Sequence, residues 1–260
     1  MQLSAYQVNG VWQQPTHAEI IDFLTAYARE AQPVDVAVVA PHPDDAEIAM
    51  GATISILVRQ GLKVAIVDLT NGEPTPAGTV ETRLAEAKAA GEILGIDLRV
   101  TMDLPNRYLE DTVENRIKVA EVLRLIRPRI LFAPYWVDAH PDHRAAAALV
   151  EAARFYAKLS KTTMSGVRHY PARIFHFSSN HYRLHLEPSF VFDCTGGMDA
   201  KLAALAAYNT QFNTDERQFS EVRAAIESYG RYWGRLIRRP FGEPFFSREV
   251  IGIESIHSIL

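Results

Sequence analysis

Short, mainly apolar runs alternate with longer stretches of mixed apolar and polar residues between residues 34 and 158. A short apolar run bounded by turn residues is typical of a strand that is buried on both faces. The longer stretches have the length and composition of helices. The apolar runs predict strands at residues 34–40, 63–69, 98–102 and 129–133, and the mixed stretches predict helices at residues 46–60, 80–94, 113–126 and 143–158.

This alternation of strand and helix predicts an α/β fold, because right-handed crossovers place helices on both faces of a parallel sheet. The chain after residue 158 is less regular. There we expect strands at residues 172–177 and 190–193 and helices at residues 198–212 and 219–238. We divide the chain into an N-terminal extension, residues 1–33, with a short helix at 18–31, and one domain, residues 34–260, with a C-terminal α+β embellishment.

Composition narrows the class of protein and of site. A chain of 260 residues can bury a large core, and its net charge of -4, without a block of Lys or Arg, argues against a nucleic-acid partner. Its single cysteine, Cys194, excludes a multi-cysteine zinc cluster, so a metal site needs His and carboxylate ligands. We see neither a signal peptide nor an apolar stretch near the roughly 20 residues that span a bilayer, and we expect a cytoplasmic protein.

Two His-Pro-Asp elements follow predicted strands, at residues 42–44 and 140–142. In open α/β sheets, ligands bind beyond the carboxyl ends of the strands, where both elements lie. His42 and Asp45 are three residues apart across a strand-to-helix turn, and His143 begins a later helix. Two histidines and one carboxylate are a ligand set for Zn²⁺ that leaves a position open for water, and Fe²⁺ uses the same set.

Two residues beside these ligands have the chemistry of a proton acceptor and a proton donor. Asp44 can take a proton from water that a metal has activated, and His140, when protonated, can stabilise an oxyanion or donate to a leaving nitrogen. A metal, a base and an acid together predict an amide hydrolase. Each residue alone has a structural explanation, since Asp44 and Asp45 precede a helix that an aspartate caps well.

The motif Pro-His-Pro-Asp-Asp of residues 41–45, followed by Glu47 and by the downstream His-Pro-Asp-His of residues 140–143, resembles the PIG-L or LmbE-like deacetylases. The resemblance covers residues 34–212, and its connecting segments are most similar to the branch that deacetylates N-acetylglucosaminyl malate in bacillithiol biosynthesis. It implies a Rossmann-like three-layer fold, a homo-oligomer and a small N-acetyl sugar as substrate. It also implies zinc held by His42, Asp45 and His143, with Asp44 as base and His140 stabilising the transition state.

The same resemblance places Arg83 beside the pocket, where a guanidinium can hold a carboxylate or sugar hydroxyls. The competing explanation is a surface arginine paired with Glu81 or Glu86 along its helix. Asn106 is a further candidate for substrate binding. Weaker candidates for the same role are Arg107, Asn180 and His181.

Three alternatives stay open at this point. The substrate can be another N-acetyl sugar, such as a chitooligosaccharide, a mycothiol-type precursor or an antibiotic intermediate. A nucleotide-binding protein is disfavoured, because residues 41–45 place carboxylates where a phosphate would bind and contain no Gly-x-Gly-x-x-Gly. A catalytically silent metal-binding relative is disfavoured because Asp44 and His140 are both present.

Overall fold

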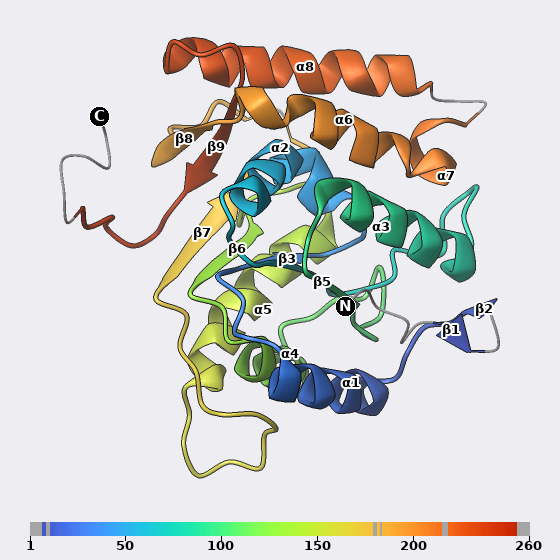
Figure 1. Ribbon diagram of the computed structural model, residues 1–260, viewed down its shortest axis with the longest axis vertical. Helices are drawn as coiled ribbons and strands as arrows, with labels where there is room; N and C mark the ends of the chain where they lie inside the picture. Colours follow the sequence, from blue (N-terminus) through green and yellow to red (C-terminus); the bar gives the residue numbers. More distant parts are fainter. Residues whose placement is uncertain (1–6, 9–10, 179–180, 183, 215–217, 254–260) are drawn as a thin grey trace.

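The computed structural model describes residues 7–8, 11–178, 181–182, 184–214 and 218–253. Its core is a seven-stranded sheet in the order β5-β4-β3-β6-β7-β9-β8 (Figure 1). The strands are β3 (Val36–Ala40), β4 (Val64–Asp68), β5 (Leu98–Thr101), β6 (Ile130–Pro134), β7 (Arg173–Phe177), β8 (Phe190–Asp193) and β9 (Gly242–Phe246). The first five in this order run parallel, whereas β9 is antiparallel to both of its neighbours. The prediction of an α/β fold with a mostly parallel sheet is confirmed.

Helices cover both faces of the sheet and complete three layers (Figure 1). One layer contains α1 (His17–Glu30), α4 (Val113–Ile126) and α5 (Pro141–Ala157). On the other face lie α2 (Asp45–Arg59) and α3 (Val80–Leu94). Helices α6 (Met198–Ala206) and α7 (Asn209–Phe212) pack on α2 and α3, and α8 (Phe219–Leu236) packs against β9. A 3₁₀ turn, η2 (Thr195–Gly197), leads into α6, and a small hairpin of β1 (Gln7–Val8) and β2 (Val11–Trp12) precedes α1.

Strand β3 shows why the apolar runs form central strands. Successive side chains of a strand point to opposite faces of the sheet. Ala37 and Val39 pack into the core cluster beneath α1, α4 and α5, whereas Val36, Val38 and Ala40 pack into the cluster beneath α2, α3 and α6. All five side chains are buried, so both faces of the strand need apolar residues and no polar alternation is visible in the sequence.

The strand order reverses at β3. The chain leaves β3 for β4 and β5 on one side, then returns to add β6 and β7 on the other side. The carboxyl ends of β3 and β6 therefore lie next to each other at the switch point, where open α/β sheets bind ligands. His42 follows β3, and His140 and His143 follow β6, so the topology brings both His-Pro-Asp elements to one place.

The N-terminal segment contributes to the same core. Helix α1 begins with a capping box formed by Thr16 and Glu19, and it packs against α4. Its Ile20 and Leu24 are buried in the cluster that includes the strands. The helix predicted at residues 18–31 is thus present, and it is a structural part of its layer. The division at residue 33 stays a prediction.

The predicted helix at residues 198–212 is wrong in one respect, because the chain forms two helices separated at Tyr208. Tyr208 has non-helical backbone angles of φ -84° and ψ 63°. Its ring is fully buried, and its hydroxyl donates a hydrogen bond of 2.9 Å to Glu47 Oε1 on α2. The break in the helix lets this side chain reach a partner that lies 161 residues away in the sequence.

Strand β9 has no counterpart among the sequence predictions. It contains Gly and Pro, which are poor strand formers, and its position depends on distant partners. The buried carboxylate of Glu243 accepts hydrogen bonds from the backbone N–H (2.7 Å) and hydroxyl (2.5 Å) of Thr53, and its Oε1 lies 2.6 Å from Lys201 Nζ. These contacts attach β9 to α2 and α6.

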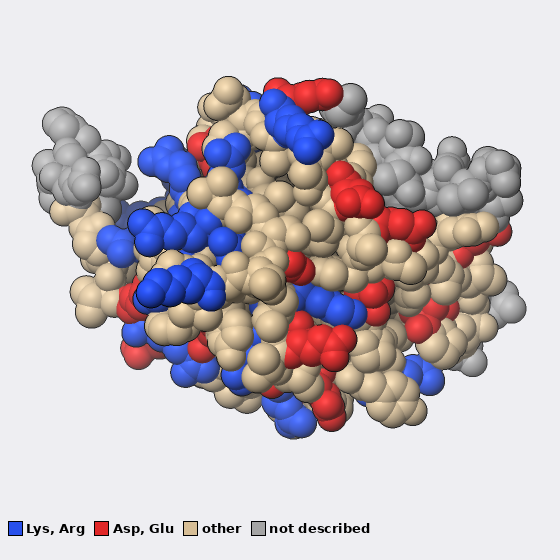
Figure 2. Space-filling model, turned by 90° about the horizontal axis from the view of Figure 1, so that it is seen from below, with Lys and Arg blue, Asp and Glu red and all other residues tan. Residues whose placement is uncertain are grey.

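Surface charge and helix composition are relevant to two possible partners, a nucleic acid and a membrane. Figure 2 shows the face opposite α8, where Lys and Arg gather toward one end and Asp and Glu are spread over the rest. This face therefore lacks the single sign of charge with which proteins bind a nucleic-acid backbone. Among the described residues, every helix is too short or too polar to cross a membrane.

Candidate metal and catalytic site

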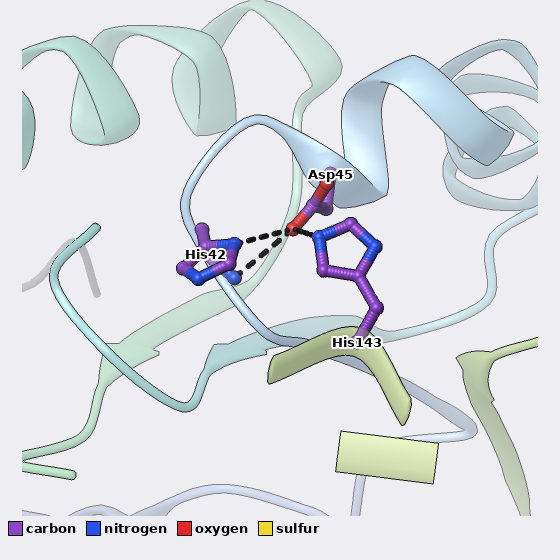
Figure 3. Close-up of side chains that lie close together, drawn as sticks. All are labelled: His42, Asp45 and His143. Atoms are coloured by element: carbon purple, nitrogen blue, oxygen red, sulfur yellow. Dashed lines mark hydrogen bonds and ion pairs between the residues drawn. The ribbon is translucent and has the colours of Figure 1, made fainter. Parts of the chain in front are cut away.

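Three side chains converge at the switch point, His42 from the turn after β3, Asp45 from α2 and His143 from α5 (Figure 3). Asp45 Oδ2 lies 3.1 Å from His42 Nδ1 and 3.2 Å from His143 Nε2. One ligand atom from each residue lies within 4.8 Å of the other two, and all three residues are buried. The structure thus brings together the three residues that the sequence suggested as metal ligands.

Each histidine directs its second ring nitrogen at a different carboxylate. His42 Nε2 lies 3.2 Å from Asp142 Oδ2, and His143 Nδ1 lies 2.9 Å from Asp138 Oδ2. A carboxylate on the far nitrogen fixes the tautomer and orientation of a metal-binding histidine. His143 Nε2 is buried and points at Asp45 Oδ2, the ligand atom that it would share with a cation. The donor set fits a divalent metal ion.

Two other trios of the same residue types overlap this one. They are His42, His140 and Asp142, and Asp138, His143 and His181. Each includes a histidine that is less buried, and each uses a carboxylate that already orients a ring of the first trio. We therefore assign the fully buried trio as the candidate metal centre and the two carboxylates as its supports.

The electrostatics of the centre favour a positive charge. Burial disfavours protonation of His42, but hydrogen bonds with Asp142 and Asp45 outweigh it and raise its pKa to about 9. Burial has the same effect on His143, but the charge of Asp45 and hydrogen bonds with Asp138 and Asp45 raise its pKa to about 10. Burial opposes ionisation of Asp45, yet the two histidines hold its pKa well below the usual range. The carboxylates stabilise positive charge here, which is what a bound cation supplies.

Asp44 stands at the first position before α2, yet its side chain makes no capping hydrogen bond. Its φ of 101° is in the left-handed region, which non-glycine residues rarely adopt. This backbone directs the side chain into the cavity, where Oδ2 accepts a hydrogen bond of 3.0 Å from Arg83 Nη2. Burial raises the pKa of Asp44 to about 7, against the attraction of the Arg83 guanidinium. The capping explanation for Asp44 is wrong, and the residue has the pKa of a proton acceptor at neutral pH.

Arg83 is buried, with 3% of its surface exposed, and it does not pair with Glu81 or Glu86. Its Nη2 donates to Pro43 O (2.7 Å) as well as to Asp44. Its Nε and Nη1 have no hydrogen-bond partner among the described residues, and the side chain lines the cavity. The competing explanation of a surface arginine is therefore wrong. Arg83 therefore holds the carboxylate of Asp44 through Nη2, and its Nε and Nη1 take no part in that contact.

The guanidinium of Arg83 lies against Gly72. This glycine has a φ of +75°, and a Cβ there would meet Arg83 Nε at 3.2 Å. A larger residue would have to displace the guanidinium or the turn. Gly72 thus combines the left-handed backbone that suits glycine with the space that Arg83 needs.

His140 is the N-cap residue of α5, and its Nδ1 accepts a hydrogen bond of 3.1 Å from the backbone N–H of Asp142. Burial and the neighbouring His42 and His143 lower its pKa, so the ring is neutral near pH 7. With Nδ1 acting as acceptor, the proton of the neutral ring is on Nε2. The neutral ring has one N–H to donate, and the role of a protonated His140 stays a prediction.

The centre opens into a cavity of about 580 Å³. Asn106, Arg107 and His181 line it, together with residues of α8 such as Ile226. Arg107 is tied to the rim by a hydrogen bond of 2.6 Å from its Nη2 to Pro74 O. The candidate Asn180 lies outside the described residues.

Asp138 and Asp142, which support the two histidines, are not among the site residues predicted from the sequence. Asp142 accepts hydrogen bonds from the backbone N–H groups of Arg107 (2.7 Å) and Leu109 (3.3 Å), so it also holds the loop that carries Asn106. Asp142 lies inside the second His-Pro-Asp element, and Asp138 lies two residues before it. A metal-binding histidine usually has a carboxylate on its other ring nitrogen. A search of the sequence near the predicted histidine ligands for such carboxylates could have identified both residues.

The structure thus combines a Rossmann-like, mostly parallel sheet with a buried His-Asp-His cluster that could hold a metal ion and with an adjacent carboxylate. The family model described as PIG-L, GlcNAc-PI de-N-acetylase, matches residues 37–154. Two curated relatives match over most of their length, and the chain belongs to the PIG-L family.

One of these relatives is the diacetylchitobiose deacetylase of Thermococcus kodakarensis, which is 30% identical over 219 residues, covering 79% of this chain and 79% of the relative. Another is a probable N-acetyl-alpha-D-glucosaminyl L-malate deacetylase 2 of Bacillus cereus, which is 31% identical over 211 residues, covering 74% of this chain and 89% of the relative. Among solved structures, a conserved protein of Thermus thermophilus has a TM-score of 0.78 and 38% identity, covering 85% of this chain and 97% of that one.

Proposed function

We propose that this protein is a metal-dependent N-deacetylase that hydrolyses the acetamide of an N-acetylglucosamine-containing small molecule to a free amine and acetate. The observation that carries the proposal is the buried His42–Asp45–His143 trio with Asp44 beside it, in the same cavity. Membership of the PIG-L family and relatives named as deacetylases of such sugars support the choice of bond and substrate class.

The three residues of the trio would hold the cation, and we propose Zn²⁺, although Fe²⁺ accepts the same ligands. When bound, the ion supplies Lewis-acid polarisation of the amide carbonyl and activation of water at neutral pH. Asp142 and Asp138 keep His42 and His143 oriented for this task. The protein therefore contributes a centre whose ligand directions are set before the substrate arrives.

Asp44 accepts the proton of the attacking water in this proposal. Its pKa of about 7 suits a base that must take up and then release a proton near neutral pH. Arg83 Nη2 holds one carboxylate oxygen, which leaves the other oxygen for water. Arg83 is thus the residue that positions the base, and because its side chain lines the cavity we propose that it also contacts the substrate.

His140 donates from Nε2 to the oxygen that becomes negative in the tetrahedral transition state. The backbone N–H of Asp142 holds the opposite nitrogen, so the ring does not have to reorganise during the reaction. Asn106, on the loop held by Asp142, contacts the substrate from the cavity rim. Both roles are proposals.

The first experiment measures free-amine release from N-acetylglucosaminyl malate and from N-acetylglucosamine, before and after chelation and with zinc or iron(II) restored. Turnover that is lost on chelation and regained with metal supports the proposed chemistry. The cation that restores the higher rate at matched occupancy identifies the metal. Absence of turnover in protein that binds a full equivalent of metal would refute N-deacetylation of both sugars. The cytoplasmic location and the homo-oligomer stay predictions.

A further inference from the structure

Next to the Asp44–Arg83 pair lies a fully buried tyrosine, Tyr208, which no step of the proposed reaction uses. The Arg83 guanidinium lies over its ring, with Cζ 5.6 Å from the ring centroid. Arg83 in turn donates from Nη2 to Asp44 Oδ2 at 3.0 Å. A cation over an aromatic face is attracted by the negative charge of that face. Only the Arg83 side chain therefore separates Tyr208 from the proposed base, and full burial leaves Tyr208 no surface for contact with a substrate.

The hydroxyl of Tyr208 is fixed by a buried cluster of charges. It donates a hydrogen bond of 2.9 Å to Glu47 Oε1, and Arg99 Nη1 donates to the same oxygen at 2.6 Å. Arg99 also makes two hydrogen bonds, of 2.7 and 2.9 Å, to the carboxylate of Asp68. Burial raises the pKa of Tyr208 well above its usual value, so the hydroxyl keeps its proton and remains a donor. Because Glu47, Arg99 and Asp68 belong to α2, β5 and β4, the tyrosine is anchored to three elements of the core.

Arg83 depends on such a neighbour because few other groups restrain its guanidinium. Its Nε and Nη1 are buried and have no hydrogen-bond partner among the described residues, whereas Nη2 donates to Pro43 O and to Asp44. Gly72 limits the space on another side, since a Cβ there would meet Nε at 3.2 Å. A buried charge with unpaired donors is costly, and an aromatic face compensates part of that cost. Without the Tyr208 ring, the guanidinium would lose this compensation and gain space in which to move away from Asp44.

We propose that Tyr208 is a positioning residue of the deacetylation, whose ring holds the Arg83 guanidinium on Asp44 while its hydroxyl, bound to Glu47, holds the ring. This inference rests on the proposed function, because Asp44 is the base of that reaction. The break between α6 and α7 places the Tyr208 side chain against Glu47 of α2 and Arg83 of α3. Tyr208 lies outside residues 37–154, which match the family model, so the C-terminal helices contribute to the site through this contact.

The first test compares kcat per equivalent of bound metal in the wild type, Tyr208→Leu and Tyr208→Phe, with N-acetylglucosaminyl malate and N-acetylglucosamine as substrates. Tyr208→Leu is expected to lower kcat about 3- to 30-fold, the range for loss of a desolvated contact between a cation and an aromatic ring. Tyr208→Phe keeps the ring and is expected to lose less than about threefold. A loss in Tyr208→Phe as large as that in Tyr208→Leu would overturn the assignment to the ring.

Phe245→Leu is the matched control for Tyr208→Leu. Phe245 is another fully buried ring of the same core cluster, and it lies on β9, where it packs on Phe132 and Phe190. The control is expected to retain wild-type kcat per bound metal. A loss in Phe245→Leu equal to that in Tyr208→Leu would show the general effect of a loosened core and would overturn the proposal.

A double-mutant cycle tests whether Tyr208 acts through Arg83. In an Arg83→Met background, Tyr208→Leu is expected to lower kcat less than about twofold, because the group that the ring positions is gone. The same loss from Tyr208→Leu in both backgrounds would mean that the two residues act independently, which contradicts the proposal.

Crystal structures of the zinc-loaded variants separate this proposal from the proposed function. The hydrogen bond from Arg83 Nη2 to Asp44 Oδ2 is expected to be absent in Tyr208→Leu and present in Tyr208→Phe. That result supports the positioning role even if no acetamide is hydrolysed by any of the proteins, in which case only the proposed function fails. An Arg83–Asp44 hydrogen bond that stays at 3.0 Å in Tyr208→Leu would overturn the proposal.

Discussion

Replacing Asp44 with asparagine removes a negative charge and a proton acceptor while it keeps the shape of the side chain. The amide oxygen can still accept the hydrogen bond from Arg83 Nη2, which is 3.0 Å long in the wild type. Asparagine also tolerates the backbone φ of 101° better than most residues. The variant therefore isolates the proton-accepting function of Asp44 from its contribution to the local geometry.

The expected loss of turnover follows from the role of the base. A positioned general base contributes typically about 10²- to 10⁴-fold, so kcat is expected to fall by that factor, equivalent to roughly 3–5 kcal/mol in the activation barrier. Metal content is expected to stay at the wild-type level, because His42, Asp45 and His143 are unchanged. The assay is free-amine release at saturating substrate, together with elemental analysis of the same preparation.

Stability provides a second readout of the Asp44 variant. The pKa of Asp44 in the folded protein, about 7, exceeds the ordinary aspartate value of 3.8, because burial penalises the charged form. A carboxyl group with a raised folded pKa favours the native state at low pH and loses that contribution as the pH rises from about 4 through 7. Neutral asparagine has no such penalty, so at pH 8 we expect the metal-free variant to be at least as stable as the wild type.

The control for Asp44→Asn is Asp22→Asn, which makes the same chemical change at an exposed site on α1. The control is expected to retain wild-type turnover and metal content. Near-full turnover in Asp44→Asn would remove Asp44 from the mechanism. Loss of metal from Asp44→Asn would show that the residue supports the ligands instead of the reaction.

Three further variants and one titration test the remaining contacts. His143→Ala is expected to lose the metal, and a full equivalent in that variant would show that another residue is the third ligand. Asp142→Asn is expected to weaken metal binding about 10- to 100-fold, measured by competition with a chelator, because it perturbs the carboxylate on His42 Nε2. Metal affinity is expected to rise with pH up to about 10, because binding must displace protons from His42 and His143, whose pKa values are about 9 and 10. A metal affinity that does not depend on pH would refute this expectation. Lys201→Met is expected to lower the free energy of unfolding by about 3–5 kcal/mol, because it leaves the buried Glu243 carboxylate without its cation. Urea denaturation measures this loss, and a loss below about 1 kcal/mol would contradict that reasoning.

The elements of the α/β core were predictable because each follows from a local pattern. Buried parallel strands need apolar residues on both faces, and the structure places β3 and β4 within residues 34–40 and 63–69, as expected. The helices predicted at residues 80–94 and 113–126 have the same bounds in the structure. Outside the core the local pattern was weaker, and β9 was missed because its contacts with α2 and α6 compensate for a poor strand sequence.

The sequence by itself determined the kind of ligand, because a chain with one cysteine needs His and carboxylate side chains for a metal site. The two His-Pro-Asp elements then indicated His42, Asp45 and His143. Tertiary structure decided how these residues are oriented and supported. The contact of Arg83 with Asp44 joins residues 39 positions apart, and a contact between such distant residues produces no periodic pattern in the sequence. The pattern of buried and exposed residues within a strand or helix can be predicted from the local sequence, because the residues that form it belong to the same element. The directions of site side chains depend instead on which elements the sheet topology places side by side.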